Sequence, residues 1–312
     1  MIINVVLCTY DRYELLDEAI ASVVGQDLSS RDYRITVIDN SPDAARSREM
    51  SHRWRGTRNL LWHHEPVAGL SRARNLGLDA TTTPLVAFLD DDAVASESWL
   101  ARKIEAFEAL GPDAHIIGGR VRPRFEGIRP AWLADSMLCY LSACDLGEET
   151  RFIEPHEWVV GANLSYRTAA VKKAGGFSTA LGRVGGGASL MSNDETDLQD
   201  RISAQGGLTG YSPLAEVEHI VLSSRLRQSW FRKRLAWQAV SDYVRVPDVM
   251  QANAAGAWDR TKRFLASCPP ADRTLRGLAL AHNDSDRFTA QIGATYDAVH
   301  AILAGLDEDD AG

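Results

Sequence analysis

Three consecutive aspartates, Asp90, Asp91 and Asp92, end an apolar run of the sequence. The run, Pro84-Leu85-Val86-Ala87-Phe88-Leu89, is short and uninterrupted, which predicts a buried strand of a parallel sheet. The aspartates then lie at the carboxyl end of that strand, the edge at which open α/β sheets bind ligands. Because side chains alternate along a strand, we expect Asp90 and Asp92 to point one way and Asp91 the other.

The aspartate triplet fits either a cation site or a solvated turn. Adjacent like charges repel one another and are costly to desolvate, so a divalent cation is the simplest partner for them. Asp90 and Asp92 offer the oxygen ligands that Mg²⁺ or Mn²⁺ prefers and leave the metal open to phosphate oxygens. A turn that caps a helix beginning near Ser96 is the common role of an isolated acidic triplet. The surrounding sequence has to decide between the two.

Strand-like and helix-like segments alternate through the N-terminal part of the chain. Runs rich in β-branched residues over 2–8 and 34–38 predict buried strands, and a helical apolar period separates them. The first run leads into Asp11 and the second ends at Asp39. This order predicts βαβ units and an α/β fold with an open, mainly parallel sheet flanked by helices. We expect Asp11, Asp39 and the aspartate triplet to meet along one edge of that sheet.

Composition excludes several classes of protein. The 312 residues carry 34 Lys and Arg against 42 Asp and Glu, a formal charge of −8, which argues against general nucleic-acid binding. The four cysteines lack zinc or redox spacing and are expected to be reduced thiols of a cytoplasmic protein. We find no leader-like N terminus and no run of about 18 apolar residues, so neither export nor a membrane span is expected. The absence of Gly-x-Gly-x-x-Gly after the first strand disfavours a dehydrogenase.

Two loops in the middle of the chain contain tryptophan. Trp132 follows Arg129-Pro130-Ala131, and Trp158 precedes Gly161-Ala162-Asn163. Loops that mix aromatic, glycine and polar residues often frame a site, so Trp132, Trp158 and Asn163 are candidate contacts to a second substrate. A tryptophan that simply packs is equally ordinary.

The C-terminal half adds acidic, histidine and basic motifs. Asp194 and Glu195 fall in the first turn of a predicted helix, where the macrodipole alone favours acids. His219 lies on a predicted strand over 208–221, and a lone histidine is commonly structural. The basic segment 225–245 is predicted to form a helix. Its aromatic residues either pack on the protein or contact the anionic surface at the inner face of the membrane.

Five segments, taken in order, resemble glycosyltransferase family 2: Val5–Arg12, Val37–Asn40, Gly69–Asn75, Phe88–Asp92, and Gly161-Ala162-Asn163 through Asp197-Leu198. The resemblance implies a GT-A fold and inverting transfer of a sugar from a nucleotide-diphosphate sugar, with UDP-sugar as the first choice, to an acceptor hydroxyl. It implies a catalytic domain over 1–224, with a nucleotide-binding half over 1–121 and an acceptor-binding half over 122–224. A helical extension over 225–312 would follow. The motifs specify neither the sugar, the acceptor nor the oligomeric state.

The resemblance also implies roles for single residues. Asp90 and Asp92 match the family's Asp-x-Asp and would hold Mn²⁺ or Mg²⁺, and His219 loosely matches a further ligand. The family's Glu-Asp pair, whose Asp is the general base, falls on Asp194-Glu195. The order is reversed here, so Glu195 is the expected base and Asp194 its rival. The residues expected to contact the nucleotide are Thr9, Tyr10, Arg12, Asp39, Arg72, Asn75, Asp90 and Asp91.

Two other functions fit part of the sequence. The segment Asp90-Asp91-Asp92-Ala93-Val94 also matches the Asp-x-Asp-x-Val pattern of haloacid-dehalogenase-like phosphatases. That pattern should follow the first strand of the domain, whereas predicted strands over 2–8, 34–38 and 60–64 precede it here. The reversed Asp194-Glu195 pair is also compatible with a non-catalytic module that binds a sugar nucleotide or glycan. Phosphate release from monoesters would identify the phosphatase, and binding without turnover the module.

Overall fold

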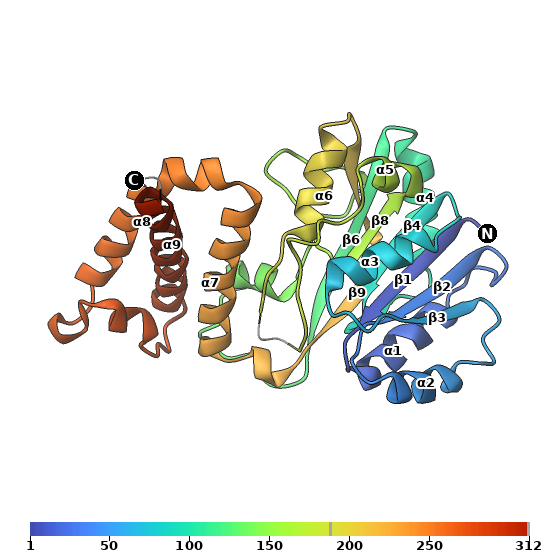
Figure 1. The fold of residues 1–312 in the computed structure, drawn as a ribbon, viewed down its shortest axis with the longest axis horizontal. Helices are drawn as coiled ribbons and strands as arrows, with labels where there is room; N and C mark the ends of the chain where they lie inside the picture. The colour runs from blue at the N-terminus through green and yellow to red at the C-terminus, as the bar shows by residue number, and fades with distance from the viewer. Residues whose placement is uncertain (187–188, 311–312) are drawn as a thin grey trace. The chain divides into compact units, whose positions relative to one another are not determined.

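The computed structural model describes residues 1–186 and 189–310, which form two compact units (Figure 1). The first unit comprises Met1–Arg124, Ser142–Ala188 and Asp194–Ile220. The second comprises Phe125–Leu141, Ser189–Asn193 and Val221–Gly312. The expected division of residues 1–224 into a nucleotide-binding and an acceptor-binding half stays a prediction.

A sheet of nine strands, counted over the described residues, forms the centre of the first unit, in the order β3-β2-β1-β4-β8-β6-β9-β5 with β7 beside β9. Its parallel strands are β1 (Ile3–Thr9), β2 (Tyr33–Asp39), β3 (Leu60–His64) and β4 (Leu85–Asp90). Antiparallel pairing brings in β5 (Ala93–Ala95), β6 (Ala114–Phe125), β7 (Arg151–Phe152), β8 (Asn163–Arg167) and β9 (Leu208–Val221). The predicted α/β fold with an open, mainly parallel sheet is confirmed.

Helices flank the sheet and connect its parallel strands (Figure 1). Their bounds are α1 (Tyr13–Val24), α2 (Ala44–Arg53), α3 (Leu70–Asp79), α4 (Trp99–Leu110), α5 (Thr168–Lys173) and α6 (Asp194–Ser203). Buried positions on α1 recur at helical spacing, as its apolar period predicts. Helix α3 packs closely on β1, because a Cβ at Gly77 would lie only 2.4 Å from Val6 Cγ1. Glycine at this position therefore allows the close approach.

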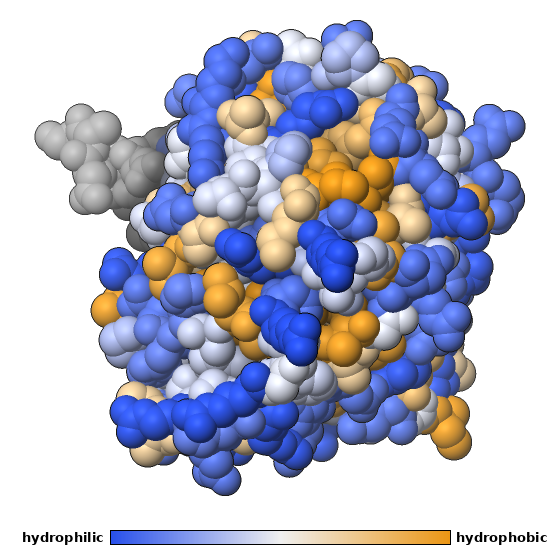
Figure 2. Space-filling model, turned by 90° about the vertical axis from the view of Figure 1, so that its right-hand side faces the viewer, coloured by the Kyte–Doolittle hydropathy of each residue, from blue (hydrophilic) through white to orange (hydrophobic). Residues whose placement is uncertain are grey.

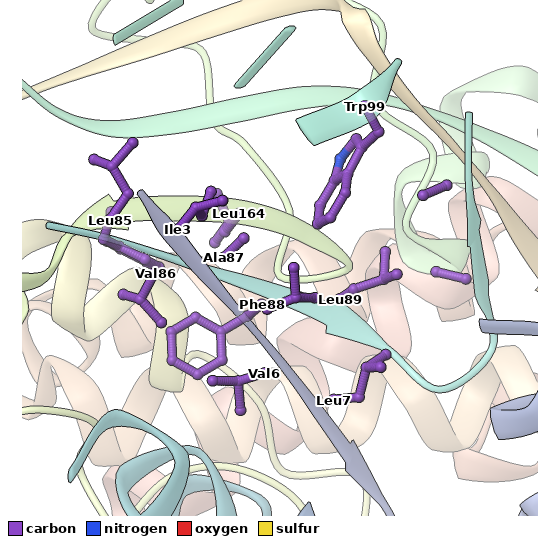
Figure 3. Close-up of a cluster of buried hydrophobic side chains, with 14 of the residues drawn as sticks. Ile3, Val6, Leu7, Leu85, Val86, Ala87, Phe88, Leu89, Trp99 and Leu164 are labelled. Atoms are coloured by element: carbon purple, nitrogen blue, oxygen red, sulfur yellow. The ribbon is translucent and has the colours of Figure 1, made fainter. Parts of the chain in front are cut away.

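The apolar core of the first unit surrounds β1 and β4. Strand β4 is buried from Leu85 to Leu89, and Asp90 is the first of its residues to reach solvent. Figure 3 shows Val6 and Phe88 on one side of the two strands and Trp99 on the other. Burial on both faces explains why the sequence of β4 is continuously apolar up to the aspartates. On the face of the molecule shown in Figure 2, hydrophilic side chains predominate and hydrophobic ones gather in small patches.

The second unit is helical. It contains η1 (Asp135–Leu141), η2 (Ser223–Arg225), α7 (Gln228–Arg245), α8 (Pro247–Ala266), η3 (Pro270–Asp272), η4 (Leu275–Ala279) and α9 (Ser285–Asp310). Phe231 and Leu235 of α7 are buried in its apolar cluster, and Phe288 and Ile292 of α9 complete that cluster with residues of 133–141. Among the described residues, every helix is too short or too polar to cross a bilayer.

Candidate active site

Polar residues gather where β1, β2 and β4 end. The parallel register places Thr9 beside Asp39, and Cys8 beside Asp90. Asp11 lies in the turn that follows β1. The expectation that Asp39 and the aspartates after β4 share one edge of the sheet is confirmed, and this is the edge at which such sheets bind ligands.

A second strand pairing brings His219 to the aspartates. Directly after Asp92 the chain enters the short strand β5, whose Ala93 pairs with His219 of β9. The amide of Ile220 donates to the carbonyl oxygen of Asp92 at 2.7 Å. The backbone thereby holds Asp92 and His219 next to each other, although they are far apart in the sequence.

Asp90, Asp92 and His219 form a candidate metal centre. One side-chain ligand atom of each lies within 4.8 Å of the others. His219 Nε2 lies 3.2 Å from Asp92 Oδ1, while the buried Nδ1 has no hydrogen-bond partner among the described residues. Two carboxylates and an imidazole suit a divalent first-row cation, and the oxygen majority favours Mn²⁺ or Mg²⁺. The side chains present therefore fit a divalent metal.

Asp91 belongs to a separate ion cluster with Thr9 and Arg12. The Thr9 hydroxyl donates to Asp91 Oδ2 at 2.7 Å, and the guanidinium of Arg12 binds both Asp91 oxygens. Arg12 Nη1 also donates to Asp92 Oδ2 at 2.7 Å. Burial raises the pKa of Asp91 to about 6, although the charge of Arg12 opposes this shift. In this structure Thr9 and Asp91 bind each other, and Arg12 links Asp91 to the candidate metal centre.

Asp39 is buried beneath the edge of the sheet. Its carboxylate accepts hydrogen bonds from Tyr13 Oη at 3.0 Å and from Ser41 Oγ at 2.5 Å. The ring of Tyr10 lies beside a glycine turn, since a Cβ built at Gly186 would stand 3.6 Å from its Cε1 atom. Tyr10 is half-buried, whereas Asp39 is fully buried.

Helix α3 supplies two further residues expected near the nucleotide. Arg72 is half exposed, and its Nε lies 3.3 Å from Glu65 Oε1. Asn75 binds the backbone of Phe177 on both sides: its Nδ2 donates to the carbonyl oxygen at 2.9 Å and its Oδ1 accepts from the amide at 2.8 Å. Asn75 therefore fastens a loop to α3 in this structure, while Arg72 remains accessible.

Asp194 and Glu195 begin helix α6 and differ in their surroundings. The Asp194 carboxylate is buried, 2.5 Å from Arg74 Nη1 and 3.2 Å from Ser71 Oγ. Glu195 Oε1 lies 3.1 Å from the same Arg74 nitrogen, and its side chain remains 21% exposed. Burial, reinforced by the charge of Glu195, raises the pKa of Asp194 to about 7. Burial opposes ionisation of Glu195 too, but Arg74 holds the pKa of Glu195 down at about 2.

The carboxylate of Glu195 rests against the backbone at Gly161. A Cβ built at Gly161 would stand 1.8 Å from Glu195 Oε1. Any larger residue at this position would displace the carboxylate. Gly161 and Arg74 thus bound the space in which the Glu195 carboxylate lies.

Arg74 is the residue of this site to which the sequence patterns assigned no role. It is nearly fully buried, and its second terminal nitrogen lies 3.4 Å from Asp90 Oδ1. A signal was available: Ser71, Arg74 and Leu78 fall at helical spacing on the buried face of α3. An arginine on a buried helix face needs carboxylate partners, and this requirement could have identified it.

The three residues expected to contact the acceptor occupy different environments. Trp132 packs edge-on against Phe231 and Phe288 in the second unit, with ring centroids 5.5 and 4.8 Å apart. Asn163 is fully buried, and it donates to Ala215 O at 2.7 Å and accepts from the indole of a neighbouring tryptophan. Trp158, by contrast, is 59% exposed. Of the three, Trp158 is the one whose side chain is free to contact a substrate.

The amino-acid sequence matches a described family and several characterised relatives. Residues 4–169 match the sequence model of Glycosyl transferase family 2. The chain is 28% identical over 259 residues to "Glucosyl-dolichyl phosphate glucuronosyltransferase" of Haloferax volcanii. This alignment covers 82% of this chain and 80% of the relative. It is 30% identical over 237 residues to "Succinoglycan biosynthesis protein ExoM" of Rhizobium meliloti. That alignment covers 74% of this chain and 71% of the relative.

Solved structures share the fold. Mannosyltransferase PcManGT from Pyrobaculum calidifontis, in complex with GDP-Man and Mn²⁺, superimposes with a TM-score of 0.64 at 18% identity, covering 96% of this chain and 86% of that chain. S. aureus TarS 1-349 in complex with UDP gives a TM-score of 0.56 at 15% identity, covering 98% and 92% of the two chains. At these identities the likeness establishes the architecture.

Proposed function

The chain belongs to glycosyl transferase family 2, and we propose that it moves a sugar from a nucleotide-diphosphate donor to an acceptor hydroxyl with inversion, using Glu195 as the general base. Membership of this family makes the chain an enzyme that transfers glycosyl groups. Its structure has the GT-A fold. The observation that carries the finer proposal is the meeting of two carboxylate groups around Arg74. Asp90 of the candidate metal centre and Glu195 of the helix α6 pair both lie within 3.4 Å of its guanidinium.

The donor side of the proposal uses Asp90, Asp92 and His219. These residues would hold a divalent cation, and we favour Mn²⁺ because the ligand set mixes carboxylates with an imidazole. Such a cation stabilises the negative charge that develops on a departing nucleoside diphosphate. Arg12 and Arg72 add positive charge near the same sheet edge, which suits an anionic donor. UDP-sugar is the proposed donor; among the similar structures, TarS binds UDP and UDP-GlcNAc, and PcManGT binds GDP-Man.

The proton-transfer side uses Glu195. An acceptor hydroxyl is a poor nucleophile until a carboxylate within hydrogen-bond reach accepts its proton. The Glu195 side chain is 21% exposed, whereas the Asp194 side chain is 2% exposed and is held by Arg74 and Ser71. Accessibility to an acceptor hydroxyl therefore favours Glu195 as the base. The acceptor oxygen forms its bond to the anomeric carbon as the bond to the diphosphate oxygen breaks, and the hydroxyl proton passes to Glu195. One such displacement inverts the anomeric carbon.

The acceptor side of the proposal uses Trp158. Its exposed ring lies on the loop that leads to Gly161, the residue against which the Glu195 carboxylate rests. An exposed aromatic face suits the apolar face of a sugar ring, so we propose a sugar-bearing acceptor. The name of the Haloferax volcanii relative, which specifies a glucosyl-dolichyl phosphate, agrees with an acceptor of this kind.

Helix α7 is given no membrane role in this proposal. Its Phe231 and Leu235 are buried within the second unit, and Arg232 donates to the carbonyl oxygens of Leu278, Ala279 and Leu280. These contacts account for Phe231, Leu235 and Arg232 by packing and hydrogen bonding within the second unit. Contact of residues 225–245 with a membrane surface stays a prediction.

A nucleotide-sugar screen tests the proposal. Thermal unfolding with a panel of UDP- and GDP-sugars, each with and without Mn²⁺, should show stabilisation by one donor that depends on the metal. Turnover of that donor to free nucleoside diphosphate, with an acceptor, would establish the enzyme. Binding without turnover would favour the non-catalytic module, and phosphate release from monoesters would favour the phosphatase. The phosphatase is disfavoured because Asp90 ends the fourth strand along the chain.

A further inference from the structure

Arg74 contacts carboxylates from two distant segments of the first unit. Its Nη1 lies 2.5 Å from Asp194 Oδ2 and 3.1 Å from Glu195 Oε1. Its Nη2 lies 3.4 Å from Asp90 Oδ1. One nitrogen is shared by the helix α6 pair, and the other faces the end of β4. The planar guanidinium can serve both groups at once because its donors are arranged in a fixed fork.

The surrounding packing fixes the position of Arg74. The side chain is only 3% exposed, and its guanidinium carbon stands 5.4 Å from the centroid of the Phe177 ring. Phe177 is itself held from α3, because the Asn75 side chain binds both its amide and its carbonyl group. The arginine and its aromatic support therefore depend on the same helix, which leaves the guanidinium little freedom to move.

Arg74 also compensates the negative charge of the carboxylates around it. It faces three carboxylates, and Asp194 and Glu195 are consecutive residues that would repel each other if both were ionised without it. Ser71 Oγ lies 3.2 Å from Asp194 Oδ2 and gives that residue a partner of its own. The Glu195 carboxylate lies between Arg74 and the backbone at Gly161.

We propose that Arg74 is a positioning residue for proton transfer, which holds the Glu195 carboxylate in place and ties it to Asp90 at the donor edge. This inference rests on the proposed function, since it assigns Glu195 the role of base. Arg74 does not itself receive the proton or bind the donor. Its loss should therefore lower the rate of transfer at saturation and leave donor affinity nearly unchanged.

Arg74→Lys is the decisive variant, because lysine keeps the charge but cannot serve both groups through one fork. We expect kcat to fall about 100-fold, the size of effect that misplacement of a catalytic group produces. The donor Kd, measured by calorimetry with Mn²⁺, should change less than about threefold. Ser71→Ala removes one Asp194 contact without touching Asp90 and should lower kcat in the same direction by a smaller factor.

Arg167→Lys provides the matched control. Arg167 also lies over an aromatic ring, 5.3 Å from the centroid of Phe107, and it donates to backbone carbonyl groups. It pairs with Leu85, at the opposite end of β4 from Asp90. We expect near wild-type kcat for this variant. A comparable loss of kcat in Arg167→Lys would show that replacing a ring-stacked arginine lowers kcat wherever it lies, through its effect on folding. That result would overturn the proposal.

A double variant separates this inference from the proposed function. If Arg74 acts through Glu195, Arg74→Lys combined with Glu195→Gln should be no slower than Glu195→Gln alone. Additive losses, or a loss of donor affinity that matches the loss of kcat, would overturn the role of Arg74 while leaving Glu195 as base. Normal turnover of Glu195→Gln alone would instead refute the base, and this inference with it.

Discussion

His219 Nε2 lies 3.2 Å from Oδ1 of Asp92, and both side chains are almost fully buried. The pairing of β5 with β9 creates this contact, because Ala93, directly after Asp92, pairs with His219. An imidazole nitrogen and a carboxylate oxygen that lie this close can both bind one divalent cation. The relationship makes His219 a testable part of the candidate metal centre.

Replacing His219 should weaken metal binding. We expect His219→Ala to raise the Kd for Mn²⁺ by at least about 10-fold, because one of three protein ligands is lost. Calorimetric titration of Mn²⁺ into the protein without donor measures this effect directly. His63→Ala is the control, since His63 is exposed on β3. Equal Mn²⁺ affinity in the two variants would remove His219 from the centre.

Removing the metal should stop transfer. Because Asp90 and Asp92 face an anionic diphosphate in the proposed complex, the donor should bind poorly to chelator-treated protein, and turnover should return when Mn²⁺ is added. Asp92→Ala should lose the response to Mn²⁺ altogether. The assay is release of nucleoside diphosphate with and without chelator. Donor binding that is indifferent to the chelator would contradict this account.

Gly161→Ala should impair the base without affecting the donor. The added Cβ would meet Glu195 Oε1 at 1.8 Å, so the carboxylate must move. We expect kcat to fall by about 10- to 100-fold, since displacement of a catalytic group by about 1 Å costs this much. Gly56→Ala is the control, because a Cβ there meets nothing within 4 Å. Unchanged kcat in Gly161→Ala would place the base elsewhere.

Asp194 should make the stability of the protein depend on pH. Burial raises its pKa in the folded state to about 7, well above the ordinary value of an aspartate, so the folded protein binds more protons than the unfolded chain between these values. The free energy of unfolding should therefore fall as pH rises through this window. Asp194→Asn cannot ionise and should lack this component. Its stability relative to wild type should improve from about pH 5 to about pH 8.

Urea unfolding of wild type and Asp194→Asn at several pH values tests whether the free energy of unfolding changes with pH in the expected direction. If the free energies of unfolding of the two proteins differ by a constant amount from about pH 5 to about pH 8, Asp194 has the same pKa in the folded and unfolded states. The shift of Glu195 has the opposite sign and acts only at lower pH, because its pKa is depressed towards about 2. Asp91, whose pKa is also raised to about 6, contributes to both proteins, so the difference between wild type and Asp194→Asn isolates Asp194.

Features that depend on neighbouring residues in the chain could be predicted from the sequence. The apolar run before Asp90 and the β-branched run before Thr9 both became central strands, since burial on both faces requires continuous apolar sequence. Helix α2 gave no such signal. Ser47 is its buried residue, and its N-terminus is set by Asp43, whose side chain accepts from two backbone amides.

Long-range partners could not be read from local pattern. Asn75 and Asn163 stand in motifs that suggested ligand contacts, yet in the structure their amides bind Phe177 and backbone groups of β6 and β9. A buried polar group takes whatever partner the fold brings to it, and that partner lies far away in sequence. The burial of Arg74 could be predicted from its place on α3, but its partners could not, because Asp194 comes to α3 only through the tertiary fold.

The most direct test of the account is the turnover of Glu195→Gln at saturating donor, Mn²⁺ and acceptor. Because an amide cannot accept the acceptor's proton, kcat should fall by about 10²- to 10⁴-fold while the donor Kd is retained. Asp197→Asn, which changes another acid of α6 that pairs with Arg201, should keep near wild-type kcat. Near-normal kcat in Glu195→Gln would contradict the central claim that this carboxylate activates the acceptor.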